Sequence, residues 1–164
     1  MSEYKKAVLA GGCFWGLEDL LRSRPGIVDT EAGYCGGKND NPTYEVHPGH
    51  AEAVEVTYDP SVITYQQVLD FFFQIHNPTT LNRQGNDRGS SYRSTIFYGN
   101  KEEKSVAEEM IEIVNESFRW HDPVVTTLEP LTRFWPAEDY HQDYLQKRPG
   151  GYTCHAIYFG SYLK

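Results

Sequence analysis

The sequence is poor in the features that would place it in a membrane or on a nucleic acid. No apolar run approaches the roughly 18 residues needed to span a bilayer. The 15 Lys and Arg are outnumbered by 23 Asp and Glu, and the net charge of −8 argues against a nucleic-acid or anionic-membrane partner. The apolar run Ala7 to Ala10 is too short for an export signal, so we expect a cytoplasmic protein.

Cysteine is also scarce. The chain has three cysteines, Cys13, Cys35 and Cys154, and no C-x-x-C pair. An odd number without an export signal does not indicate a structural disulfide framework. No cysteine and histidine cluster has the spacing of a zinc site, and we expect no metal and no other cofactor. In a reducing compartment, scarce cysteines favour a reactive thiol.

The patterns that are present predict one domain over residues 1–164. Alternating apolar residues predict strands at 6–10, 27–34, 51–58, 93–98 and 124–129. Helical spacing predicts helices at 14–21, 64–75, 101–118 and 138–145. The first six elements run β-α-β-β-α-β, which favours the α+β class and a ferredoxin-like split βαβ sandwich. We expect an extra helix and strand beyond this core, and an irregular, flexible C-terminal tail at 146–164.

Cys13 lies in GGCFWG, between the end of a strand and the start of a helix. Unpaired N–H groups and the positive end of the helix dipole would point at its sulfur. Such a position can lower the pKa of a thiol and favour the nucleophilic thiolate. A buried structural cysteine explains the local sequence equally well, because free cysteines are often simply buried.

Glu52 lies in GHAEAVEVTY, where alternate residues share one face of a strand. It falls on the same face as the apolar Val54 and Val56. Burial there would raise the pKa of the carboxyl, so that it holds a proton at neutral pH and acts as an acid. A solvated strand end is the alternative, and parity alone does not separate the two.

Weaker candidates lie in three loops, where local sequence favours a plain turn or an incidental residue. Asp87 and Tyr92 lie in QGNDRGSSY, and Tyr44 follows the turn of NPTY. Cys154 lies in the glycine-rich tail RPGGYTCHA, from which a mobile thiol could reach an oxidised Cys13.

Taken together, these motifs resemble the A-type peptide methionine sulfoxide reductases along nearly the whole chain. GGCFWG matches the signature of that family at the nucleophile. NPTY, GHAEAVEVTYDP, QGNDRGSSYRS and YHQDYL match in the expected order. The resemblance implies reduction of the S epimer of methionine sulfoxide, free or in proteins, as a repair of oxidative damage.

The resemblance also implies roles for individual residues. Cys13 would attack the sulfoxide sulfur and become a sulfenic acid, Glu52 would protonate the oxygen, and Cys154 would resolve the sulfenic acid as a disulfide. Thioredoxin would then reduce that disulfide. The substrate would be held by five residues that the family motifs share: Phe14 and Trp15 at its S-methyl group, the hydroxyls of Tyr44 and Tyr92 at its oxygen, and Asp87 organising this network.

Two features depart from the family pattern. The stretch between Tyr44 and Glu52 is short, so we expect a trimmed loop there. Cys35 lies in GYCGG, where the family has no recycling cysteine, and its role stays unexplained.

The rival interpretations are a cysteine hydrolase, a thiol peroxidase and a peptide-binding module without catalysis. The hydrolase would need a histidine base beside Cys13. Four histidines are available for that role: His50, His76, His141 and His155.

Overall fold

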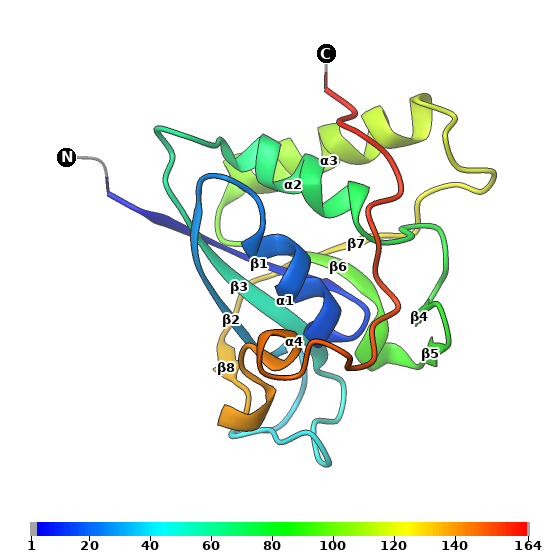
Figure 1. The fold of residues 1–164 in the computed structure, drawn as a ribbon. Helices are drawn as coiled ribbons and strands as arrows, with labels where there is room; N and C mark the ends of the chain where they lie inside the picture. Colours follow the sequence, from blue (N-terminus) through cyan, green and yellow to red (C-terminus); the bar gives the residue numbers. More distant parts are fainter. Residues whose placement is uncertain (1–2, 164) are drawn as a thin grey trace.

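A sheet of six strands forms the centre of the protein, in a computed structural model that describes residues 3–163. The strand order is β7-β6-β1-β3-β2-β8, and all neighbours are antiparallel except the parallel pair β6 and β7. Along the chain the strands are β1 (Lys5–Gly11), β2 (Ile27–Cys35), β3 (Ala51–Tyr58), β6 (Ser94–Tyr98), β7 (Thr127–Pro130) and β8 (Phe134–Pro136) (Figure 1). The α+β class predicted from the sequence is confirmed.

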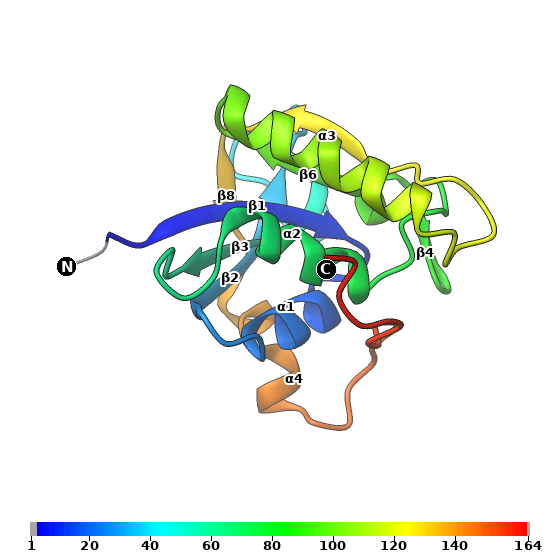
Figure 2. The same cartoon turned by 90° about the horizontal axis from the view of Figure 1, so that it is seen from above.

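The longer helices share one apolar core with the sheet. They are α1 (Phe14–Arg22), α2 (Tyr65–Gln74) and α3 (Lys101–Glu116). Their buried side chains join one cluster with inward residues of β1 and β3, such as Leu9 and Val54. Figures 1 and 2 show α1 and α2 against the central strands. Because β1 runs directly into α1, the turn between them lies at the edge of this core.

The start of α2 shows how local sequence sets an element boundary. The Thr64 hydroxyl accepts a hydrogen bond from the Gln67 N–H at 3.1 Å, and the Gln67 side chain accepts one from the Thr64 N–H at 2.9 Å. Such a capping box satisfies two backbone donors that a helix start leaves free. The helix predicted at 64–75 therefore starts where the sequence places it.

Three regions differ from the sequence prediction. The helix predicted at 138–145 is two short pieces, the 3-10 turn η2 (Asp139–His141) and α4 (Tyr144–Lys147), because Asp143 between them has a left-handed φ of 54°. The strand predicted at 124–129 begins later, at Thr127. Strand β8 was not predicted, since three residues ending in a proline leave no readable alternation.

The loop that contains QGNDRGSSY carries its own small elements. These are the two-residue strands β4 (Arg83–Gln84) and β5 (Asp87–Arg88), which pair with each other, and the 3-10 turn η1 (Ser90–Tyr92). The hairpin brings Gln84 and Asp87 to a defined position instead of leaving them on an open turn.

Residues 148–163 contain no helix or strand but are fastened to the rest of the fold. The two oxygens of Asp70 in α2 accept hydrogen bonds from the Tyr162 N–H at 2.8 Å and the Ser161 hydroxyl at 2.7 Å. The Arg119 guanidinium donates to the Gly160 carbonyl at 2.7 Å and lies over the Tyr162 ring. The tail therefore crosses the molecule between α4 and α2 (Figure 1).

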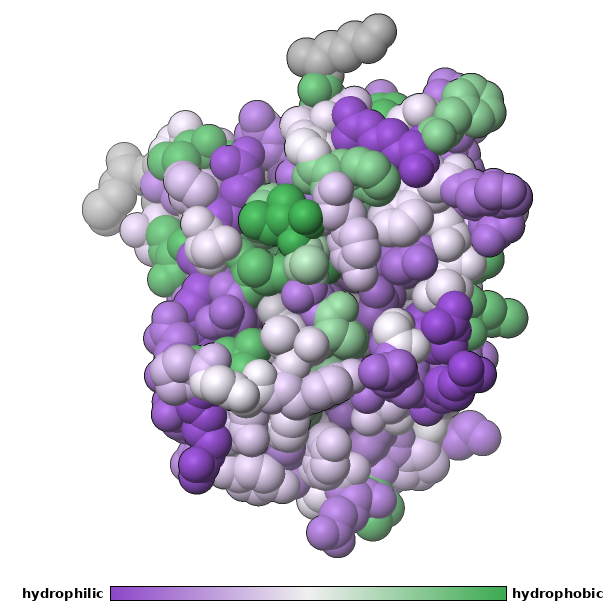
Figure 3. Space-filling model, turned by 45° about the vertical axis from the view of Figure 1, so that its right-hand side comes forward, coloured by the Kyte–Doolittle hydropathy of each residue, from purple (hydrophilic) through white to green (hydrophobic). Residues whose placement is uncertain are grey.

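Hydrophilic and neutral residues dominate the face in Figure 3, and hydrophobic residues form separate groups. Within residues 3–163, every helix is too short or too polar to cross a bilayer.

Candidate active site

Cys13 occupies the turn between β1 and α1, immediately before the first helical residue. Gly12 has a φ of +98°, and an added Cβ there would overlap the Gln84 side chain. Only glycine fits that conformation and that space. Gly12 thus lets the QGND hairpin pack against the turn that presents the thiol.

The Cys13 thiol is buried, with 7% of the residue exposed. Burial raises the pKa of the thiol well above its ordinary value, and the nearby charge of Glu52 raises it further. The Trp15 backbone N–H opposes the shift. The sequence-based expectation of a lowered pKa is therefore wrong in sign for the resting site, because loss of water and a neighbouring carboxylate outweigh the helix terminus.

Glu52 faces the interior from β3, opposite Tyr34 of β2, and is only 1% exposed. Its Oε1 accepts a hydrogen bond from the Phe14 N–H at 3.2 Å. Among the described residues, no lysine or arginine forms a salt bridge with this carboxyl. Burial raises its pKa to about 8, Asp87 adds to the rise, and the Phe14 N–H opposes it. A solvated strand end is thereby excluded.

The two predicted tyrosines converge on Glu52 from different loops. Burial raises the pKa of Tyr44 and of Tyr92, and in both the charge of Glu52 is the next cause. The two hydroxyls also interact with each other. Asp87 lies close enough to raise the pKa of both. One carboxyl of raised pKa and two hydroxyls therefore lie within electrostatic reach of one another.

Phe14 and Trp15 follow Cys13 but face different surroundings. Phe14 is fully buried against Tyr34, with ring centroids 5.6 Å apart. Trp15 stacks on Tyr144 at 3.8 Å with nearly parallel rings, and its Nε1–H donates to His141 Nδ1 at 2.9 Å. An apolar wall thus lies directly beside the thiol.

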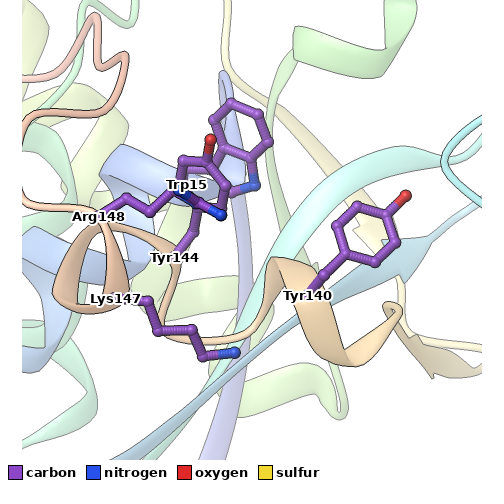
Figure 4. A pocket seen from close by; sticks show the side chains of 5 residues that line it. All are labelled: Trp15, Tyr140, Tyr144, Lys147 and Arg148. Atoms are coloured by element: carbon purple, nitrogen blue, oxygen red, sulfur yellow. The ribbon is translucent and has the colours of Figure 1, made fainter.

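Beyond Trp15 the surface opens into a pocket of about 740 Å³. Three aromatic and two basic side chains line it, and Figure 4 shows them projecting from α1, η2 and the region of α4: Trp15, Tyr140, Tyr144, Lys147 and Arg148. A pocket therefore lies on the far side of Trp15, the second residue after Cys13.

From the sequence, Glu138 was missed and His141 was considered only as a hydrolase base. His141 holds the Trp15 indole, and Glu138 accepts hydrogen bonds from the Tyr44 N–H at 3.0 Å and the Tyr34 hydroxyl at 2.8 Å. Both lie in the segment after β8. The YHQDYL motif was the available signal, because it contains His141 and Tyr144.

The tail brings Cys154 to the same turn. The Cys13 backbone N–H interacts with the Cys154 sulfur, and that sulfur lies 3.6 Å from Asp87 Oδ2. The Tyr152 hydroxyl donates to the same oxygen at 3.1 Å. Burial, followed by the charge of Asp87, raises the pKa of Cys154 to about 11.

Cys35 lies elsewhere. It is fully buried at the end of β2, in a small cluster with Phe97 and Ala51 on the other face of the sheet. Burial raises its pKa to about 12, the charges of Glu129 and Glu55 raise it further, and Arg93 opposes the rise. The residues that surround Cys13 are thus separate from those around Cys35.

The histidines do not form a hydrolase site. In the described part of the chain, no histidine ring hydrogen-bonds to the Cys13 sulfur, and His76 bonds instead to the Phe72 carbonyl and the Ser94 hydroxyl. Within residues 3–163, no three His, Cys, Asp or Glu side chains gather as metal ligands would.

Comparisons with known proteins agree on one family. The family model described as "Peptide methionine sulfoxide reductase" matches residues 5–161. A peptide methionine sulfoxide reductase MsrA of Mycobacterium sp. (strain MCS) is 59% identical over 155 residues, which cover 94% of this chain and 91% of that protein.

Two solved structures extend the likeness to the fold. Mxr1 from Saccharomyces cerevisiae in reduced form has a TM-score of 0.83 at 38% identity, covering 96% of this chain and 93% of that one. The same yeast protein in complex with Trx2 has a TM-score of 0.61 at 28% identity, covering 96% and 91%.

Proposed function

This chain belongs to the peptide methionine sulfoxide reductase family, and from that premise we propose that it reduces the S epimer of methionine sulfoxide, free or in proteins, to methionine. The observation that carries the proposal is the Glu52 carboxyl, which is buried without a cationic partner and joined to the Cys13 turn through the Phe14 N–H. A sulfoxide oxygen leaves poorly unless it is protonated. An acid that keeps its proton near neutral pH supplies what this reaction needs.

In the proposed first step, the Cys13 sulfur attacks the sulfoxide sulfur while Glu52 gives its proton to the oxygen. The oxygen passes to Cys13, which becomes a sulfenic acid, and methionine leaves with the electron pair. The proton lost by the thiol replaces the one that Glu52 gave. Thiol oxidation and sulfoxide reduction each involve two electrons, so the step balances.

The acid and the nucleophile support each other electrostatically. The charge of Glu52 is the second cause of the raised pKa of Cys13. When Glu52 holds its proton, that charge is absent and the thiolate forms more easily. The protonated carboxyl thus favours both proton donation to the oxygen and ionisation of the attacking sulfur.

The remaining roles follow the positions of the side chains. Phe14 and Trp15 would enclose the S-methyl group, and the hydroxyls of Tyr44 and Tyr92 would bind the oxygen beside Glu52. Asp87 would organise these groups.

In the second step, Cys154 would attack the Cys13 sulfenic acid, forming a disulfide and releasing water. Thioredoxin would reduce the disulfide, as the complex of the yeast relative with Trx2 suggests. A cytoplasmic location and repair of oxidised proteins belong to the same proposal, as does movement of the part of the segment 146–164 around Cys154, between its two fastened ends. The strand order β6-β1-β3-β2 supports classing the core as a ferredoxin-like sandwich.

A single-turnover reaction tests the proposal. Reduced protein is mixed with S-methionine sulfoxide without reductant, methionine is quantified, and disulfides are mapped by mass spectrometry. The wild type should yield methionine and a Cys13–Cys154 bond, and Cys154→Ser should yield methionine and a trapped Cys13 sulfenic acid. A Cys13–Cys35 bond would overturn the resolving role of Cys154, and absence of methionine would overturn the function.

A further inference from the structure

His155, the residue after Cys154, is held in a single tautomer. Its Nε2 lies 2.6 Å from the Gly11 carbonyl oxygen, which only accepts hydrogen bonds. Nε2 therefore carries the ring proton, and Nδ1 keeps its lone pair. That lone pair lies 3.8 Å from the Cys154 sulfur, within the range of a hydrogen bond from a thiol.

The glycines of the Cys13 turn make room for this ring. An added Cβ at Gly16 would overlap His155 Nδ1 and the Thr153 hydroxyl, and one at Gly12 would crowd His155 Nε2. The Thr153 hydroxyl also accepts the His155 backbone N–H at 3.1 Å. The imidazole is therefore buried in a fixed orientation, between the turn that bears one thiol and the sulfur of the other.

We propose that His155 is the general base for disulfide formation, a role that rests on the proposed function. As the Cys154 sulfur attacks the Cys13 sulfenic acid, His155 Nδ1 takes the thiol proton. The new S–S bond replaces the S–O bond of Cys13, and the departing hydroxide recovers a proton from the imidazolium to become water. The two sulfurs share the oxidation, and no external oxidant or reductant enters the step.

Asp87 is the other acceptor that faces the Cys154 thiol. A carboxylate is less suited to this step, because it is ordinarily a weaker base than an imidazole, with a reference pKa of about 4 against about 6.5. While Asp87 stays charged, it raises the pKa of Cys154 and so disfavours the thiolate. The same Asp87 oxygen is also occupied by the Tyr152 hydroxyl. An imidazole that gains a proton becomes positive beside the thiolate and attracts it. Asp87 favours that positive charge too, since it opposes the effect of burial on the pKa of His155.

The groups that face Cys154 and His155 come from β1 and the turn after it, from β5, from the segment after α2 and from the tail itself. Around Cys154 they are Asp87, Tyr152, Tyr158 and the Cys13 N–H, and around His155 they are the Gly11 carbonyl, Asp87 and the buried His76. Burial lowers the pKa of His155 below its ordinary value, so the ring stays neutral and able to accept a proton at neutral pH.

Two substitutions separate the proton-accepting role from the structural role. His155→Gln places an amide N–H where Nε2 was, so it can keep the bond to Gly11 but has no base at the Nδ1 position. His155→Asn places an amide at the Nδ1 position and loses the bond to Gly11. Each full-length variant is reduced and mixed with S-methionine sulfoxide, and methionine and the Cys13–Cys154 disulfide are followed separately by acid quench and mass spectrometry.

Near pH 7 we expect both variants to release methionine at close to the wild-type rate, and to form the disulfide about 10²-fold more slowly, the size of a lost general base. The deficit should shrink as the pH rises towards the pKa of Cys154, because hydroxide then forms the thiolate without help. A structural role would instead slow both steps at every pH, and would affect His155→Asn more than His155→Gln.

Equal disulfide rates in wild type and His155→Gln would overturn the inference, as would a deficit that is independent of pH. So would a wild-type disulfide that joins Cys13 to Cys35. These results are distinct from a failure of the proposed function, in which the wild type releases no methionine at all.

Discussion

Two glutamates of this protein are equally buried, Glu18 in α1 and Glu52 in β3, and each is 1% exposed. Glu18 has three partners: the Thr30 hydroxyl at 3.0 Å, the Asp143 N–H at 3.0 Å and the Arg22 guanidinium at 3.4 Å. Glu52 has the Phe14 N–H at 3.2 Å and no cation. Burial raises the pKa of both, but in Glu18 all three partners oppose the rise.

The difference in partners shows what distinguishes a structural carboxyl from one that can take part in catalysis. Burial alone does not mark an acid for catalysis, because a buried charge with enough partners only holds elements together. Glu18 joins α1 to β2 and to the turn before α4. Glu52 has few partners that would stabilise its charged form, so the carboxyl keeps its proton. That proton lies beside the nucleophile and can be transferred.

The largest expected effect comes from removing the proton of one glutamate. Glu52→Gln should slow methionine release by about 10²- to 10⁴-fold, the usual contribution of a general acid. Glu18→Gln is the matched control and should keep the rate per folded molecule. Both are measured by single-turnover quench with S-methionine sulfoxide. Equal losses in the two variants would show that burial, and not the proton, accounts for the effect.

The next effect concerns pH. Because the thiolate fraction of Cys13 grows with pH while protonated Glu52 is lost above a pH of about 8, the rate of methionine release should rise with pH up to about 8 and level off above it. Glu18→Gln should retain this profile, and Glu52→Gln should lose it. A wild-type rate that rises steadily through pH 8 would mean that ionisation of Cys13 alone limits the step.

The two substitutions should change stability in opposite directions. The pKa of Glu52 is raised on folding from 4.5 to about 8, so its contribution is fully present below pH 4.5 and is lost as the pH rises to about 8. The loss is about 1.4 kcal/mol per pH unit in that window. Glu52→Gln should remove this dependence and be more stable than wild type at pH 8.

Glu18→Gln should instead cost about 1–3 kcal/mol at neutral pH, because it weakens a buried network with Arg22. Urea unfolding of both variants at pH 5 and pH 8 gives the comparison. If both variants were more stable than the wild type at pH 8, the proposed difference between a structural Glu18 and a catalytic Glu52 would be wrong.

The smallest expected effect extends the comparison to the thiols. Cys35 and Cys13 are both buried, but only Cys13 lies beside Glu52. Cys35→Ala should cost about 1 kcal/mol through lost packing and leave methionine release and the disulfide unchanged. Urea unfolding and the single-turnover assay check both parts, and a slower release would give Cys35 a role in the chemistry.

The sequence predicted the helices and strands that are long enough to repeat their hydrophobic pattern several times. The strand that carries Glu52 and the helix capped by Thr64 were found because alternation and capping are local. Strand β8 and the break at Asp143 depend on distant contacts: β8 pairs with β2, and the Asp143 N–H bonds to Glu18. Such elements are too short to show a period.

The site was predicted in part for the same reason. Parity placed Glu52 on the same face as Val54 and Val56 but left its burial open. The pKa of Cys13 depends on burial and on Glu52, neither of which its local sequence contains. Glu138 reaches Tyr44 from 94 positions away along the chain. His155 was seen only as a possible hydrolase base, because its contacts with Gly11 and Cys154 appear only after the tail has packed.

The fastening of the tail has a consequence for kinetics. Cys154 lies on a segment that is held at one end by α4 and at the other by the hydrogen bonds from Ser161 and Tyr162 to Asp70. A thiol on a segment held at both ends can move through only a small volume. Its effective concentration at Cys13 therefore lies in the millimolar range or above. Formation of the Cys13–Cys154 disulfide is then a first-order reaction. Thiols in solution must first arrive by diffusion, so they compete poorly with Cys154.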